Sequence, residues 1–214
     1  MQTFLQDMFK LPIKVGSITP SQGNFLSEFL IKHPEIKIVL ETGFHIGLSA
    51  AVMMNANPKL EITSFDIFWF DYTAKAKMLL DRSFPDRHML IAGNSATSLK
   101  TFFSRNPNYS PDFVFIDGGH ERPIPYLDLH CILSNCRPGT WVMIDDYCKA
   151  HGEGGVIEAV NYFIKTNVIE EYTFYKDMDR GWVLGKRSAV EMPPLTVSEE
   201  ERIQQLADVV SHYS

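Results

Sequence analysis

The stretch IKIVLETGFHIGLSA, residues 36–50, sets the prediction of the fold. An apolar, β-branched run at 36–40 passes through Glu41 into a turn that carries Gly43 and Gly47, and a helix-like segment begins at Leu48. A buried strand, a glycine turn and a helix in this order form the first half of a βαβ unit. Small residues in the turn let a ligand approach the backbone and the helix N-terminus, although a glycine pair alone fits a plain tight turn equally well.

Short apolar runs like the first recur along the chain, and a helix-sized interval follows each of them. This alternation is typical of a parallel sheet with helical crossovers. Strands are expected at 36–40, 61–65, 88–92, 112–116 and 140–144, with helices between them that include Leu48–Ala56, Tyr72–Ser83 and Ile124–Asn135.

The alternation changes after a further helix, expected at 156–166. The next runs, 171–176 and 181–186, are separated only by the four residues DMDR. A gap this short permits a hairpin and excludes a helical crossover. We therefore predict an α/β protein with a Rossmann-like, doubly wound and mostly parallel seven-stranded sheet that has an antiparallel C-terminal hairpin strand.

The predicted sheet lies in one domain over residues 1–187, of which 1–18 are a candidate lid or substrate-binding segment. Within this domain, Thr19 and Gln22 predict a helix start, because they match the two polar positions of a capping box. Residues 188–214 are expected to form a Pro-rich linker and a helix. An apolar stripe on that helix is a candidate homodimer surface.

Composition and charge exclude several classes of function. The chain has 214 residues, a formal net charge of -6 and no Lys/Arg run, so we expect no nucleic-acid partner. No apolar stretch reaches the roughly 18 residues that span a bilayer. The first residues do not resemble a secretory signal, so we expect a cytoplasmic protein without membrane contact. The three cysteines lack CxxC spacing and are expected to be reduced thiols.

Acidic and basic side chains follow two predicted strands at their carboxyl ends, where open α/β sheets bind ligands. Asp117 and His120 follow the fourth strand, and Asp145 and Asp146 follow the fifth. Three carboxylates in a small space repel one another, and a divalent cation such as Mg²⁺ relieves that repulsion. His120 is then placed to accept a proton from a bound hydroxyl. The alternative is that each aspartate caps a helix and His120 is a surface residue.

Polar side chains also follow the first three strands. Glu41 precedes the glycine turn and could meet a cationic ligand group directly or through water. Asp66, roughly 20 residues past the glycines, is either placed to hydrogen-bond ribose hydroxyls or is a solvated acid. The sequence GNS at 93–95 could bind a purine edge, or could cap the helix that follows.

These motifs in this order resemble a known family. ETGxxxGxS, an acid after the second strand, FPDR then GNS, FIDGGH and PGxxxxIDDY are spread over roughly residues 15–187. The set is similar to the class I S-adenosylmethionine-dependent methyltransferases. Within that class, the chain most resembles the small metal-dependent O-methyltransferases of the macrocin and mycinamicin sugar type and, more distantly, the catechol type.

The resemblance implies a role for each matching position. Asp117, Asp145 and Asp146 would ligate Mg²⁺ or another divalent cation, and His120 would be the general base. The catechol type has a lysine at that spacing, so the histidine favours an alcohol such as a sugar hydroxyl. The implied cofactor site comprises Glu41, Gly43 and Gly47 at the methionine part, Asp66 at the ribose, and Asn94 and Ser95 near the adenine, with Thr42, Ser49, Ile67 and Asp117 completing it.

The implied activity is metal-assisted methyl transfer from S-adenosylmethionine to a hydroxyl of a small molecule, such as a sugar or polyol. In that reaction His120 removes the proton, and the protein mainly supplies position and electrostatics. Two other functions fit the same residues. One is a methyltransferase-fold protein that binds the cofactor without transfer, and the other is a metal-dependent hydrolase.

Overall fold

The computed structural model describes residues 17–148 and 154–195, and the chain divides into two compact units, with the boundary between Gly93 and Asn94. Most of the predicted lid and the whole predicted C-terminal helix lie outside the described residues. A single domain over residues 1–187 therefore stays a prediction, although the last strand does end at Arg187.

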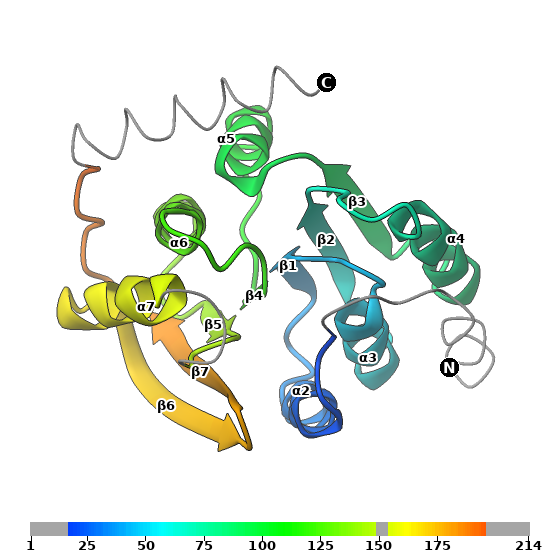
Figure 1. Ribbon diagram of the computed structural model, residues 1–214, viewed down its shortest axis with the longest axis horizontal. Helices are drawn as coiled ribbons and strands as arrows, with labels where there is room; N and C mark the ends of the chain where they lie inside the picture. Colours follow the sequence, from blue (N-terminus) through cyan, green and yellow to red (C-terminus); the bar gives the residue numbers. More distant parts are fainter. Residues whose placement is uncertain (1–16, 149–153, 196–214) are drawn as a thin grey trace. The chain divides into compact units, whose positions relative to one another are not determined.

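The N-terminal unit alternates helices with three strands in the order β3-β2-β1, and both pairs of neighbouring strands are parallel (Figure 1). Helix α2 packs against α3. The elements of this unit are α2 (Pro20–Lys32), β1 (Ile38–Thr42), α3 (Leu48–Ala56), β2 (Glu61–Asp66), α4 (Thr73–Ser83) and β3 (His88–Ala92).

The C-terminal unit has four strands in the order β4-β5-β7-β6, and α6 packs against both α5 and α7. Strands β4 and β5 are parallel, whereas β7 runs antiparallel to both β5 and β6. The elements of this unit are α5 (Ser95–Arg105), β4 (Phe113–Ile116), α6 (Ile124–Ser134), β5 (Trp141–Ile144), α7 (Gly155–Lys165), β6 (Ile169–Asp177) and β7 (Arg180–Arg187).

The predicted α/β fold class is confirmed, including its parallel strands and the reversed last strand. One boundary differs in a way that affects the site. The first strand was expected at 36–40, but β1 covers Ile38–Thr42, so Glu41 and Thr42 are strand residues. They pair with Ser64 and Phe65 of β2, which continues the ladder two residues beyond the apolar run.

Burial follows the expectation for parallel strands that are covered on both faces. All four residues of β4 are buried, as are the last three of β5. Strand β6, at the other end of this order, is exposed over most of its length. The reversed hairpin therefore presents one open strand, β6, beside a buried one, β7. No helix within the described ranges is long and apolar enough to cross a membrane.

The start of α2 confirms the predicted capping box. The Thr19 hydroxyl accepts from the Gln22 backbone N–H, and the Gln22 side chain accepts from the Thr19 backbone N–H at 2.7 Å. Both bonds satisfy N–H groups that have no partner inside the helix.

We expect Thr19→Ala to lower the free energy of unfolding by about 1 kcal/mol, because the substitution removes the capping oxygen. Thr19→Ser keeps that oxygen and should stay close to wild type. Urea denaturation of both variants measures the difference. Equal losses in the two variants would show that packing of the Thr19 methyl group, and not the cap, is what matters.

Candidate active site

The turn after β1 is as tight as the sequence predicted. Gly43 and Gly47 both have left-handed backbone angles, with φ of 86° and 71°. A Cβ atom at Gly47 would lie 2.6 Å from the Phe44 ring, so a larger residue does not fit there. The turn therefore brings bare backbone to the N-terminus of α3, which is an arrangement that suits a polar or anionic ligand group.

Glu41 lies entirely inside the N-terminal unit, with no exposed surface. Its two carboxylate oxygens accept hydrogen bonds from the hydroxyls of Ser49 and Ser64. The Ser64 hydroxyl also lies 2.8 Å from Nε2 of His88. Burial raises the pKa of Glu41 to about 7, against the lowering effect of the two serine bonds. These contacts join the start of α3 to β2.

Glu41 and Ser49, which were predicted to hold the cofactor, are bonded to each other in the interior of the unit. The carboxylate is bonded to serines and does not face an open surface. Thr42 beside it is also fully buried. If these residues serve the cofactor, they do so by shaping the turn, and their direct contact with a ligand stays a prediction.

Asp66 joins the same turn to the segment after β2. Its Oδ2 accepts from the His45 backbone N–H and its Oδ1 from that of Phe68, both at 2.7 Å. A carboxylate can accept about four hydrogen bonds, so two ribose hydroxyls could still be accommodated. Ile67, the neighbouring residue of the implied cofactor set, is 52% exposed. Both roles stay predictions.

In the C-terminal unit, Asn94 is the N-cap of α5, and its side chain accepts from the Ala96 backbone N–H at 3.0 Å. The structure thus supports the capping interpretation of GNS. Ser95 is the first residue of the helix. Burial raises the pKa of the Asp128 carboxyl group to about 7, against the lowering effect of Ser95. Contact of Asn94 and Ser95 with an adenine stays a prediction.

A cluster of acidic and imidazole side chains lies where β4 and β5 end. The ligand atoms of Asp117, His120 and Asp146 all lie within 4.8 Å of one another. His120 Nε2 is 2.6 Å from Asp146 Oδ2, and the Asp146 side chain is only 3% exposed. The hydrogen bond that His120 donates to Asp146 raises the pKa of His120, against the opposing effect of burial. This is an imidazole held in a fixed orientation by a nearly buried carboxylate.

Asp145 lies beside this cluster and has a different contact. Its Oδ1 accepts from the Asp146 backbone N–H at 2.7 Å, and the residue is 2% exposed. Asp146 itself has a left-handed φ of 56°. The group of three ligand atoms thus contains His120 in place of the predicted Asp145. Metal ligation by Asp117, Asp145 and Asp146 stays a prediction.

The donor set does fit a divalent cation. The half-buried Asp117 and the buried Asp146 bring two carboxylates together, and Asp145 adds a third, buried acid next to them. Such a concentration of negative charge out of water is unfavourable unless cationic groups face it. His120 supplies positive charge there only when its imidazole is protonated, and oxygen ligands of this kind suit Mg²⁺ or Mn²⁺.

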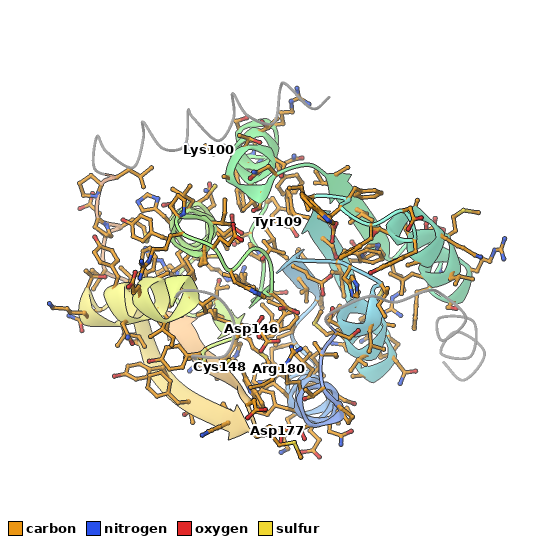
Figure 2. The ribbon with its side chains drawn as sticks, viewed as in Figure 1. Lys100, Tyr109, Asp146, Cys148, Asp177 and Arg180 are labelled. Carbon is orange, nitrogen blue, oxygen red and sulfur yellow. The ribbon has the colours of Figure 1, made fainter. Side chains whose placement is uncertain are left out.

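Two residues of this site were not predicted from the sequence. Arg180, the first residue of β7, places Nη1 3.7 Å from Asp146 Oδ1, and Figure 2 labels both side chains. Gly155, at the start of α7, lies against the His120 backbone, because a Cβ there would be 2.5 Å from the His120 carbonyl oxygen. The only sequence signals were the short DMDR turn and a glycine pair.

These features coincide with the region that a known family shares. A family model described as a methyltransferase domain matches residues 40–147, just over half of the chain. The chain belongs to this family. The matched residues run from the glycine turn of this methyltransferase to the Asp145–Asp146 pair. No curated protein matches the chain in a sequence search.

Solved structures resemble this methyltransferase over most of its length. An O-methyltransferase from Bacillus cereus, in complex with SAH, has a TM-score of 0.73 and 18% identity, covering 87% of this chain and 90% of that one. The O-methyltransferase TomG from Streptomyces achromogenes, involved in tomaymycin synthesis and in complex with SAM, has a TM-score of 0.66 and 19% identity, covering 88% and 89%. A TDP-rhamnose 3'-O-methyltransferase of calicheamicin biosynthesis has a TM-score of 0.61 and 15% identity, covering 88% and 93%. At these identities the likeness is one of fold.

Replacing Glu41 by glutamine tests its buried, proton-holding state. The folded protein keeps the Glu41 proton up to about pH 7, whereas the unfolded chain releases it near the ordinary glutamate pKa of 4.5. Wild-type stability therefore falls as pH rises through this window, by up to about 3 kcal/mol, and is restored below it. Glu41→Gln lacks this loss.

The unfolding free energy of Glu41→Gln minus that of wild type should thus increase between about pH 5 and pH 8. Urea denaturation at several pH values measures it. Glu28→Gln, at an exposed acid on α2, controls for the loss of a carboxylate. A difference that stays constant over this range would mean that Glu41 is ionised in the folded protein.

Gly155→Ala should displace the His120 backbone, because the added Cβ meets the His120 carbonyl oxygen at 2.5 Å. We expect a loss of about 1–3 kcal/mol in unfolding free energy and a change in the ring signals of His120 in NMR spectra. Gly23→Ala is the matched control, since its nearest contact is an ordinary 3.6 Å. Unchanged His120 signals in Gly155→Ala would contradict the close approach.

Proposed function

We propose that this methyltransferase transfers a methyl group from S-adenosylmethionine to a hydroxyl of a small molecule, with a divalent cation and with His120 as general base. The observation that carries the proposal is the 2.6 Å contact between His120 Nε2 and Asp146 Oδ2, inside a cluster that also contains Asp117. The acceptor class that the sequence favours is an alcohol such as a sugar or polyol.

The cofactor part of the proposal rests on the family and on the shape of the N-terminal unit. The Bacillus cereus and Streptomyces achromogenes structures hold SAH and SAM, and their shared fold supports the same cofactor here. The Gly43–Gly47 turn leaves its backbone uncovered by side chains at two positions, and Asp66 stands at the end of the next strand. When it is bound, S-adenosylmethionine supplies a methyl group whose bond to the cationic sulfur breaks as the acceptor oxygen bonds to the carbon.

His120 provides the proton transfer. Asp146 accepts from Nε2 of the ring and so holds the imidazole that takes the acceptor's proton. The nearly buried Asp146 carboxylate then faces an imidazolium and stabilises its charge. Asp146 thus orients the base and raises its pKa with one contact.

Asp117 and Asp146 are the residues that would hold a divalent cation, with Asp145 as the adjacent acid. A cation there would lower the pKa of a bound acceptor hydroxyl and offset the repulsion among the carboxylates. Arg180 already faces Asp146 at 3.7 Å and supplies part of that compensation. A cytoplasmic location and a homodimer remain predictions from the sequence.

His120→Ala tests the function. We expect turnover to fall by about 10²- to 10⁴-fold, because proton transfer loses its base, while affinity for S-adenosylmethionine stays near wild type. His33→Ala, at a histidine of α2's C-cap that pairs with Glu35, is the matched control and should keep normal turnover.

The measurement combines two assays. Calorimetry gives the affinity for S-adenosylmethionine with and without Mg²⁺, and mass spectrometry follows methylated products in cell extracts that receive labelled S-adenosylmethionine. Normal turnover of His120→Ala would overturn the base assignment. Cofactor binding without any labelled product would favour a protein that only binds the cofactor, and no cofactor binding at all would favour a hydrolase.

A further inference from the structure

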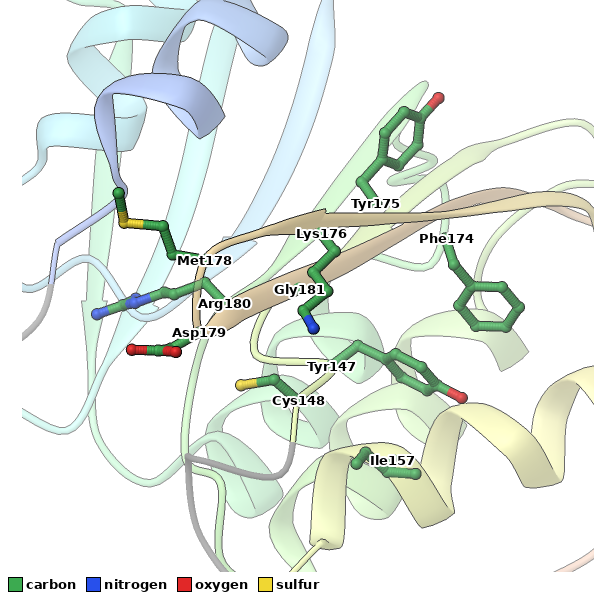
Figure 3. A pocket seen from close by; sticks show the side chains of 10 residues that line it. All are labelled: Tyr147, Cys148, Ile157, Phe174, Tyr175, Lys176, Met178, Asp179, Arg180 and Gly181. Carbon is green, nitrogen blue, oxygen red and sulfur yellow. The ribbon is translucent and has the colours of Figure 1, made fainter.

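A cavity of about 610 Å³ opens in the C-terminal unit between the β6–β7 hairpin, the start of α7 and the residues after β5 (Figure 3). Ligand pockets in proteins typically measure roughly 300–1,000 Å³. The volume therefore suits a molecule larger than a single small ring. None of the predicted site residues lines this cavity.

Two residues of the cavity wall adjoin the proposed reaction centre. Tyr147, which directly follows Asp146 in sequence, forms part of its wall. Arg180 is also in the wall and reaches Asp146 Oδ1 at 3.7 Å. The backbone N–H of Tyr147 donates to the Gly181 carbonyl oxygen at 2.8 Å, which fixes the hairpin against this wall. The cavity wall is thus joined, through Arg180, to the carboxylate that holds the base.

One side of the cavity is aromatic. The Tyr147 and Phe174 ring centroids are 4.8 Å apart with an angle of 34° between the planes, and Ile157 lies opposite them on α7 (Figure 3). Phe174 is 48% exposed although it is a large apolar residue. Aromatic faces left open beside a cavity favour a flat or weakly polar ring as the ligand.

The cavity also carries an available positive charge. In Figure 3 the Lys176 side chain points into the cavity beside Tyr147, whereas the Asp179 and Arg180 side chains extend from the hairpin tip away from Lys176 and Tyr147. Arg180 is engaged with Asp146. Lys176 has no ion pair with any residue that the structure describes, so its ammonium group can receive an anionic group of a ligand.

We propose that this cavity is the acceptor site and that it takes a hydroxylated ring compound carrying an anionic group, with the ring against Tyr147 and Phe174 and the anion on Lys176. The inference rests on the proposed methyl transfer, and it names the class of substrate for that reaction. Two kinds of molecule share this chemistry: a phenol that carries a carboxylate, and a sugar that carries a phosphate or diphosphate.

Calorimetric binding to the full-length protein tests the inference without depending on turnover. One pair of probes is 3,4-dihydroxybenzoate and its neutral amide, and the other is TDP-rhamnose and free rhamnose. We expect the anionic member of at least one pair to bind about fivefold to tenfold more tightly than its neutral partner. The pair that shows the difference identifies the source of the anion.

Substitutions then locate the contact. Lys176→Glu should abolish the preference for the anionic member, and Lys176→Arg should keep it. Lys165→Glu, which makes the same charge change at an exposed residue of α7 outside the cavity wall, is the matched control and should also keep it. Phe174→Ala should weaken both members of the pair, because it removes the ring wall.

Equal affinity for the two members of both pairs, or no binding of any probe, would overturn the inference, and so would an unchanged preference in Lys176→Glu. None of these results touches the proposed function, which depends on the separate assay of labelled methyl transfer. Conversely, a protein that binds the anionic probe through Lys176 but transfers no methyl group would retain the site and lose the proposed activity.

Discussion

The buried carboxylate of Asp146 is the constraint on which the C-terminal unit's site depends. A carboxylate out of water is unfavourable unless charged or hydrogen-bonding groups surround it. Here His120 supplies one partner from the segment after β4, and Arg180 supplies another from the start of β7. The ends of three strands must therefore meet at one point. The antiparallel pairing of β7 with β5 is what brings Arg180 to that point.

The N-terminal unit also contains a buried carboxylate, but its hydrogen-bond partners differ from those of Asp146. Glu41 is fully buried, but its partners are neutral serine hydroxyls, and burial raises its pKa to about 7. Asp66 instead accepts hydrogen bonds from two backbone N–H groups, those of His45 and Phe68. One acid of the unit thus lies buried among hydroxyl groups, while the other joins the glycine turn to the segment after β2.

Much of the fold could be predicted because its signals are local. Apolar runs at helix-sized intervals identify strands, and a gap of four residues forbids a crossover. The meeting of Asp117, His120 and Asp146 followed from one topological rule, since parallel strands end at a common edge. What the sequence could not provide was side-chain direction. Glu41 faces inward because β1 extends two residues past its apolar run. Asp146 has a left-handed φ angle that no sequence pattern predicts.

Arg180 and Gly155 escaped prediction for a related reason, since each matters through contact with a segment distant in sequence. The two strands of the hairpin that carries Arg180 are buried to different extents. Strand β7 is buried and anchored to β5, whereas β6 is exposed over most of its length. Substitutions on an exposed strand usually change stability little. Phe174 and Lys176, the β6 residues in the cavity wall, can therefore be substituted with little loss of stability while the groups around Asp146 stay in place. If the cavity is the proposed acceptor site, such substitutions change which acceptor binds and leave His120, Asp146 and Arg180 unchanged.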